Sequence, residues 1–192
     1  ERIVFIPAMG WQDYNYIKYA RVAGEDSNAV VSFHYYLPML LSHYKMLAWV
    51  GYQGAVQYPG VVIPTQSDAD KYPQYASFHK TTYNADRIMG EMSNAASDGR
   101  NAGLAVHCGE FGCSKNVAEA MRLAWFTDMV AAMEANNIPW TLWECLDGGF
   151  GFVDMEYGIY RINCPLLKVL TGKELTDAEA KALLQKYGFK TE

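Results

Sequence analysis

Glu110 is the residue of this sequence around which a chemical site is most readily built. It lies in the segment LAVHCGEFGC (Leu104–Cys113), in which a short apolar run leads into a Gly-Glu-Phe-Gly turn. Gly109 and Gly112 allow the backbone to bend tightly on either side of the acid. The pattern predicts a buried strand with one carboxylate at its carboxyl end. A solvated strand-end acid fits these residues equally well, so the outcome depends on partners from other segments.

A second predicted strand, Ala29–Tyr36 (AVVSFHYY), supplies two such partners. Successive side chains of a strand point to opposite faces, so this segment separates into an apolar and a more polar set. The two sets are Val31, Phe33 and Tyr35 on one face, and Ser32, His34 and Tyr36 on the other. We expect the apolar set to face helices, and His34 and Tyr36 to point toward the same site as Glu110.

Cleavage of a glycosidic bond is the chemistry that these groups suggest. The predicted strand IPWTLWEC adds Trp143 close to its end. Glu110 could attack an anomeric carbon, and Tyr36 could donate a hydrogen bond to that carboxylate. His34 could bind a sugar hydroxyl, and Trp143 could stack under the sugar ring. An acid, a His-x-Tyr pair and a tryptophan at neighbouring strand ends therefore favour a sugar-cleaving site.

Strands alternate with helices four times along the chain. The predicted strands are Ile3–Ile6, Ala29–Tyr36, Leu104–Cys108 and Ile138–Cys145. The predicted helices are Tyr14–Val22, Thr82–Ser97, Val117–Asn136, Pro165–Leu170 and a terminal helix within residues 176–188. Pro38–Thr81 is predicted to be a long functional loop, Gly99–Gly103 a turn and Phe152–Tyr160 irregular. The alternation implies an α/β fold with parallel strands, either a small open sheet or half of an eightfold barrel.

Composition excludes several classes of protein. The 192 residues carry a net charge of -5 with scattered lysines and arginines, which argues against nucleic-acid binding. No apolar run approaches the ~18–20 residues of a membrane span. No glycine-rich phosphate loop is present, and the spacing of the four cysteines does not suit zinc, so neither a cofactor nor a metal is expected. Cys108 and Cys145 are expected to be buried free thiols.

Three segments, in order, resemble the carboxyl-terminal half of a family five glycoside hydrolase, the cellulase-type (β/α)8 barrel. VVSFHYYLP is similar to the sixth-strand His-x-Tyr segment of that family, HCGEFG to its seventh-strand segment, and WTLWECLDGGFGFVD to its eighth-strand segment. LSHYKMLAW followed by YPG is similar to the loop after strand six in some bacterial cellulases. The resemblance covers residues 1–192. It implies a (β/α)4 half of a TIM barrel, no cofactor and a β-glucan polysaccharide or oligosaccharide as substrate.

The resemblance also implies a role for each matching residue. Glu110 would be the nucleophile of a retaining mechanism, Tyr36 its hydrogen-bond partner, and His34 a residue that contacts the substrate or the acid. Trp143 would be the platform under the sugar at the cleavage point. The weaker substrate-binding candidates are His43, Trp49 and Glu144. These residues also have structural alternatives: His34 and His43 could be satisfied loop histidines, Trp49 could pack against its own loop, and Glu144 could be a solvated or ion-paired strand-end acid.

The general acid/base of that family is not identifiable in this sequence. In the family it is the glutamate of an Asn-Glu pair on an earlier strand, and no Asn-Glu dipeptide occurs here. Four strands of a barrel also leave two open edges and an uncovered inner face. We therefore expect a second half-barrel, either an identical copy in a homodimer or a complementary chain. In a homodimer, Glu144 of the partner subunit could serve as proton donor.

Three functions remain open from the sequence. The first is an endo-β-1,4-glucanase, or a related mannanase or mixed-linkage glucanase, which would be extracellular or periplasmic by resemblance although no secretory signal is visible. The second is a non-catalytic carbohydrate-binding half-barrel, which the missing acid/base favours. The third is a fragment that assembles without a function of its own, which the abrupt start at Glu1 fits.

Overall fold

Four parallel strands form the central sheet of the computed structural model, which describes residues 2–22, 26, 28–46, 51–146 and 148–192. In spatial order they are β1 (Val4–Pro7), β2 (Ala29–Tyr35), β5 (Ala105–Phe111) and β6 (Trp140–Leu142). All three pairings are parallel, so the predicted α/β fold is confirmed. Because the strands are parallel, their carboxyl ends all lie at the same end of the sheet.

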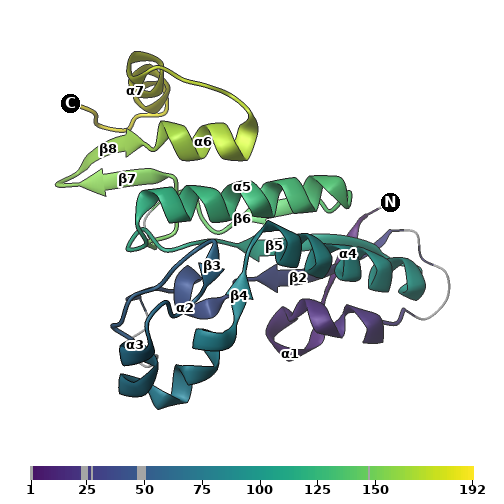
Figure 1. The fold of residues 1–192 in the computed structure, drawn as a ribbon. Coiled ribbons are helices and arrows are strands. Elements are labelled where there is room, and N and C mark those ends of the chain that lie inside the picture. The colour runs from purple at the N-terminus through teal and green to yellow at the C-terminus, as the bar shows by residue number, and fades with distance from the viewer. Residues whose placement is uncertain (1, 23–25, 27, 47–50, 147) are drawn as a thin grey trace.

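Helices cover one face of this sheet (Figure 1). α4 (Ala85–Ala102) connects β2 to β5, and α5 (Glu119–Ala135) connects β5 to β6, and the two helices pack against each other. Between β1 and β2 the connection is a short 3-10 helix, η1 (Tyr14–Tyr19), rather than the longer helix expected. Asp13 caps η1 by accepting the N–H of Asn15. Within the described ranges, no helix is long and apolar enough to cross a membrane.

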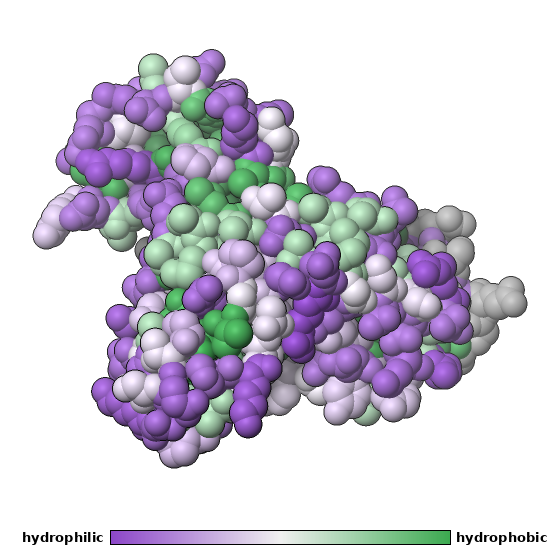
Figure 2. Space-filling view, in the orientation of Figure 1, coloured by the Kyte–Doolittle hydropathy of each residue, from purple (hydrophilic) through white to green (hydrophobic). Residues whose placement is uncertain are grey.

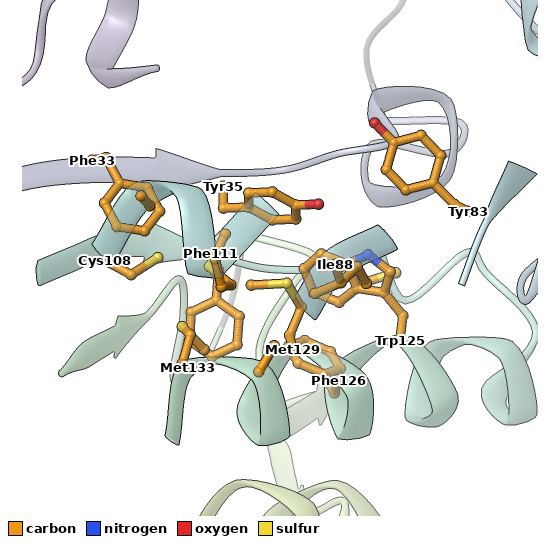
Figure 3. Close-up of a cluster of buried hydrophobic side chains, with 14 of the residues drawn as sticks. Phe33, Tyr35, Tyr83, Ile88, Cys108, Phe111, Trp125, Phe126, Met129 and Met133 are labelled. Carbon is orange, nitrogen blue, oxygen red and sulfur yellow. The ribbon is translucent and has the colours of Figure 1, made fainter. Parts of the chain in front are cut away.

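The apolar side chains of β2 pack against these helices, as their alternation predicts. Val31, Phe33 and Tyr35 are almost completely buried. Figure 3 shows the two aromatic rings of β2 in a layer with side chains of β5 and α5, which include Cys108, Phe111, Trp125, Phe126, Met129 and Met133. Burial of one large apolar side chain contributes about 1.5–3 kcal/mol. This layer therefore fixes the position of the strands on α5.

A β-bulge at Gly109 turns Glu110 away from that core. Strict alternation would place Glu110 on the same side as Cys108, facing the helices. Instead, Phe33 pairs with Cys108 whereas the next residue, His34, pairs with Glu110, so β5 carries one extra residue at this point. Cys108 is fully buried in the core. Glu110 consequently joins His34 on the opposite face.

Gly109→Ala is expected to weaken both the fold and the site. A Cβ on residue 109 would overlap Ser32 Oγ, so β2 and β5 would have to separate or Ser32 would have to rotate. We expect the free energy of unfolding to fall by about 1–3 kcal/mol, the usual cost of overpacking, as measured by urea unfolding. Gly90→Ala in α4 is the control, because its added Cβ meets no neighbouring heavy atom outside the local helix backbone, and stability should not fall. Unchanged stability of the Gly109 variant would show that the bulge tolerates a side chain.

Two connections differ from the sequence prediction. The segment after β2 is not a plain loop, because it contains α2 (Met39–Ser42), β3 (Gly60–Val61), α3 (Gln66–Lys71), η2 (Pro73–Lys80) and β4 (Thr82–Tyr83). α4 continues through Gly99, where a turn was expected, and ends at the left-handed Gly103. A Cβ on Gly99 would overlap the side chain of Val106. Glycine at this position therefore allows close helix–strand packing.

The segment expected to be irregular forms an antiparallel hairpin, β7 (Val153–Glu156) and β8 (Ile159–Ile162). Tyr157 and Gly158 form its two-residue turn, with φ of 50° and 76°. Positive φ at both residues is typical of tight hairpin turns. The prediction was wrong here because the turn lacks the Asn-Gly or Asp-Gly pair that usually marks such hairpins.

Two helices complete the chain. α6 (Cys164–Thr171) packs against α5, and α7 (Asp177–Lys186) packs against β8. The terminal helix begins as predicted, at a capping box in which Thr176 and Glu179 exchange hydrogen bonds. In Figure 2, hydrophobic residues show in the band between α6 and α5, whereas the surface over α7 is mainly hydrophilic.

The face of the sheet opposite the helices is largely uncovered. Ile3 and Phe5 leave 65% and 55% of their surfaces exposed. Phe5 lies edge-on to His107, with ring centroids 5.0 Å apart. His107 Nδ1 is buried and has no hydrogen-bond partner in the described part of the chain. No described strand pairs with the outer edge of β1 or of β6. An apolar face between open edges is a surface that requires a cover.

Candidate active site

Glu110, Tyr36 and His34 meet at the carboxyl end of the sheet. The phenol of Tyr36 donates a hydrogen bond of 3.0 Å to Glu110 Oε2. His34 Nδ1 lies 3.3 Å from the same oxygen, and the Glu110 side chain keeps 29% of its surface exposed. Glu110 Oε1 has no hydrogen-bond partner among the described residues. One carboxylate oxygen is thus oriented by two neighbours, while the other is open.

Burial sets the protonation states of the two neighbours. Burial, together with the charge of Glu110, raises the pKa of Tyr36 well above 10.0, so the phenol remains a hydrogen-bond donor at neutral pH. Burial lowers the pKa of His34 below 6.5, although the Glu110 carboxylate acts in the opposite direction. The imidazole is therefore mainly neutral at pH 7.

An aromatic wall holds Tyr36 from the other side. His43 and Phe150 contact the Tyr36 ring edge-on, with centroid distances of 4.9 and 5.8 Å. The two wall rings also contact each other, at 5.2 Å. Ser42 Oγ donates to the backbone carbonyl of Tyr36 and lies 2.9 Å from His43 Nδ1. Tyr36 is consequently fixed through its ring, its backbone and its hydroxyl.

Trp143 and Glu144 follow β6 and are joined by a cis peptide bond. The backbone N–H of Trp143 donates to the carbonyl of Phe111 at 2.9 Å, which ties the residue to the end of β5. Its side chain is exposed, and 46% of the residue surface is accessible. Glu144 Oε1 is buried without a hydrogen-bond partner in the described ranges. An exposed indole is suited to stacking on a sugar ring, whereas the buried Glu144 Oε1 is closed to a ligand.

Arg122 of α5 anchors the two loops behind this site. The side chain is buried, with 5% of the residue exposed. Its Nε donates to the carbonyl of Cys113 at 2.8 Å, and its Nη2 donates to the carbonyls of Phe150 and Gly151. One guanidinium therefore holds both the loop after β5 and the loop that carries the aromatic wall.

Two other groups of sequence predictions concern Trp49 and the cysteines. Trp49, a predicted substrate contact, lies outside the described residues. All four cysteines are free thiols, and Cys108 is buried as predicted. Cys145 is exposed, and the prediction of a buried thiol was wrong because β6 ends at Leu142. Among the residues that the structure describes, no cluster of three or more His, Cys, Asp or Glu side chains could hold a metal ion.

Trp11 is a candidate site residue that the sequence patterns did not single out. It lies in α1 (Met9–Gln12), directly after β1, and is 99% exposed. Gly10, Trp11 and Gln12 have φ of 62°, 62° and 61° and form a left-handed turn. This conformation costs about 1–2 kcal/mol per non-glycine residue, and such strain is concentrated at functional sites. The available signal was a Gly-Trp pair that begins four residues after the end of the predicted strand Ile3–Ile6.

Comparisons with known sequences indicate a family. The model of the cellulase family (glycosyl hydrolase family 5) matches residues 1–149. Endoglucanase C of Acetivibrio thermocellus is 22% identical over 143 residues, which represent 71% of this chain and 39% of the relative. Endoglucanase C307 of Clostridium sp. (strain F1) matches with the same values. The chain thus spans about two fifths of the length of the curated relatives that it matches.

Solved structures show the corresponding fold. A hyperthermophilic endo-beta-1,4-glucanase, solved in complex with substrate, superposes with a TM-score of 0.67 at 22% identity, over 90% of this chain and 48% of that one. Cel5A of Thermotoga maritima in complex with cellobiose gives 0.61 at 19% identity, over 86% and 47%. The parallel sheet and its helices therefore correspond to about half of such a barrel enzyme. Because the family model matches most of the sequence, this chain belongs to the cellulase family, glycosyl hydrolase family 5.

Proposed function

We propose that this chain provides the nucleophile-bearing half of an endo-β-1,4-glucanase with a retaining mechanism. The asymmetry of the Glu110 carboxylate carries the proposal. Its Oε2 accepts the Tyr36 hydroxyl and lies beside His34, whereas Oε1 has no partner in the described part of the chain. A carboxylate that is oriented through one oxygen and open at the other is arranged to attack an anomeric carbon. Membership of the cellulase family supports a β-glucan as substrate.

The proposed reaction proceeds in two steps. Glu110 Oε1 forms a bond to the anomeric carbon while the glycosidic oxygen leaves and takes a proton from a general acid. In the second step, water attacks the anomeric carbon and gives its proton to the same acid/base group, and the bond to Glu110 Oε1 breaks and restores the carboxylate. Tyr36 keeps the carboxylate oriented through Oε2 in both steps. Trp143 offers a stacking face to the sugar, and His43 offers an acceptor to one of its hydroxyls.

The general acid/base is proposed to come from a second half-barrel. Retaining hydrolysis needs a carboxyl group about 5–5.5 Å from the nucleophile, and the Asn-Glu pair that usually supplies it is absent from this sequence. The uncovered face around Phe5, the unpaired Nδ1 of His107 and the open edges of β1 and β6 support such a partner. This second half is either a copy of this half-barrel, offering its Glu144 as acid, or a complementary half-barrel.

Which polysaccharide is cleaved can be determined by assay. Cel5A of Thermotoga maritima has been solved with cellobiose and also with mannotriose. Reducing-sugar release from carboxymethyl cellulose, compared with release from mannan, separates the two substrate classes. We propose an extracellular or periplasmic location, because a polymeric substrate of this kind is met outside the cytoplasm.

Sedimentation velocity at low micromolar concentration, followed by the reducing-sugar assay, tests the proposal. We expect either an active dimer, or a chain that becomes active when mixed with the amino-terminal half of a family 5 endoglucanase. The absent Asn-Glu pair favours one other function, a non-catalytic carbohydrate-binding half-barrel. A compact monomer that binds cello-oligosaccharides but hydrolyses nothing, alone or mixed, would establish that second function instead.

A further inference from the structure

We propose that Ser42 is a positioning residue that holds the His43 imidazole in a single tautomer, so that Nε2 is presented as an acceptor to a sugar hydroxyl. Ser42 is fully buried at the end of α2. It lies between His43 and Tyr36, the residue whose phenol contacts Glu110. The proposal rests on the function proposed above and specifies how that site recognises its substrate.

The hydrogen bonds of Ser42 have only one consistent direction. Its Oγ lies within hydrogen-bond distance of the Tyr36 carbonyl and 2.9 Å from His43 Nδ1. A carbonyl can only accept, so the single hydroxyl proton of Ser42 is donated to Tyr36. Ser42 Oγ must then accept from His43, which places the N–H of the neutral ring on Nδ1. The lone pair of the ring is left on Nε2.

His43 Nε2 is available to a ligand. It has no hydrogen-bond partner in the described ranges. The buried side-chain atoms without a partner there are His107 Nδ1 and Glu144 Oε1, so His43 Nε2 is not among them. Burial lowers the pKa of His43, so the ring is neutral at pH 7 and Nε2 accepts a hydrogen bond rather than donating one. Contacts with Tyr36 at 4.9 Å and Phe150 at 5.2 Å fix the plane of the ring. A sugar hydroxyl is the complementary donor.

The backbone of Ser42 is held by the loop that follows β5, the strand that carries Glu110. In the loop after β5, the N–H of Ser114 donates to the Ser42 carbonyl at 2.8 Å. The Ser114 hydroxyl donates to the carbonyl of Tyr44 at 3.0 Å. The acceptor on His43 is thus fixed relative to Glu110 through the backbone. Loss of the Ser42 hydroxyl should alter hydroxyl recognition while leaving the carboxylate in place.

Ser42→Ala and Ser42→Thr test this role, because the first removes the hydroxyl and the second keeps one. NMR of chain labelled with 15N-histidine distinguishes protonated from unprotonated ring nitrogens; the sequence has only four histidines, and His43→Gln identifies the relevant signals. We expect the Nδ1–H tautomer in the wild type and in the Thr variant, and a mixed or Nε2–H state in the Ala variant. Affinity for cellotetraose should fall about 3- to 10-fold in the Ala variant, as for one neutral hydrogen bond, and recover with Thr.

Ser77→Ala is the matched control, because Ser77 is an exposed residue of η2 and its loss should change neither measurement. An Nε2–H tautomer in the wild type, or an unchanged tautomer in Ser42→Ala, overturns the proposal. If the tautomer changes as expected but the wild type binds no cello-oligosaccharide, the sugar contact and the proposed function both fail. The positioning of His43 by Ser42 then stands by itself.

Discussion

Replacement of Glu110 by Gln is expected to abolish transfer of a sugar to the protein. The suitable probe is 2,4-dinitrophenyl β-cellobioside, because its leaving group departs as a stable anion and the first step does not need the general acid. We expect the wild-type chain to release a burst of one dinitrophenolate per site, followed by slow turnover. An amide cannot act as the nucleophile, so the burst rate should fall by about 10³-fold or more, as measured by stopped-flow absorbance.

Glu134→Gln is the control for that loss. Glu134 is an exposed residue near the carboxyl end of α5. It therefore lies near the amino ends of the strands, whereas the site lies at their carboxyl ends. Its variant should give the full burst. Urea unfolding should be similar for the Glu110→Gln variant and the wild type, which separates lost chemistry from lost structure. A full burst in a folded Glu110→Gln variant would exclude Glu110 as the nucleophile.

Arg122→Met is expected to cause a large loss of stability. The buried guanidinium donates to three backbone carbonyls in two loops, at Cys113, Phe150 and Gly151. Met fills a similar volume but donates nothing, so these carbonyls would lose a charged donor. Each such bond contributes about 1.5–3 kcal/mol. We expect the free energy of unfolding to fall by about 3–5 kcal/mol in urea titrations.

Arg21→Met provides the comparison for a surface arginine. Arg21 also donates to two backbone carbonyls, those of Lys18 and Ala20, but it is exposed to solvent. Water can replace it there, so the change should remain within about 0.5 kcal/mol. Equal losses in the two variants would mean that the buried position of Arg122 confers no special stability on the loops.

The faces of β2 could be predicted from sequence because its side chains alternate simply between core and site. Val31 and Phe33 are apolar and buried against the helices. His34, the next residue along the strand, lies on the opposite face beside Glu110. Glu110 is a different case. Strict alternation from Cys108 would point the Glu110 side chain toward the helices. Only the extra residue at Gly109 brings it to the other face, beside His34. A glycine in the sequence permits a bulge, but it does not specify one.

Contacts between distant segments account for what the sequence did not reveal. Arg122 has the appearance of a surface residue in a helical pattern, yet its partners are loop carbonyls up to 29 residues away. Ser42 is adjacent to His43 in sequence, but its link to the Tyr36 carbonyl depends on how α2 folds back on the end of β2. Local periodicity carries no information about such contacts, because they form only when the loops pack together.

Covalent labelling with 2,4-dinitrophenyl 2-deoxy-2-fluoro-β-cellobioside tests the role of Glu110 most directly. The good leaving group allows the first step to proceed without an acid, and the fluorine slows hydrolysis of the glycosyl-enzyme, which then accumulates. We expect a mass increase of one fluorocellobiosyl group per chain, located on Glu110 by peptide mass spectrometry and prevented by excess cellobiose. A label on any other residue, or unlabelled protein under conditions in which cellobiose binds, would contradict the assignment of Glu110 as the nucleophile.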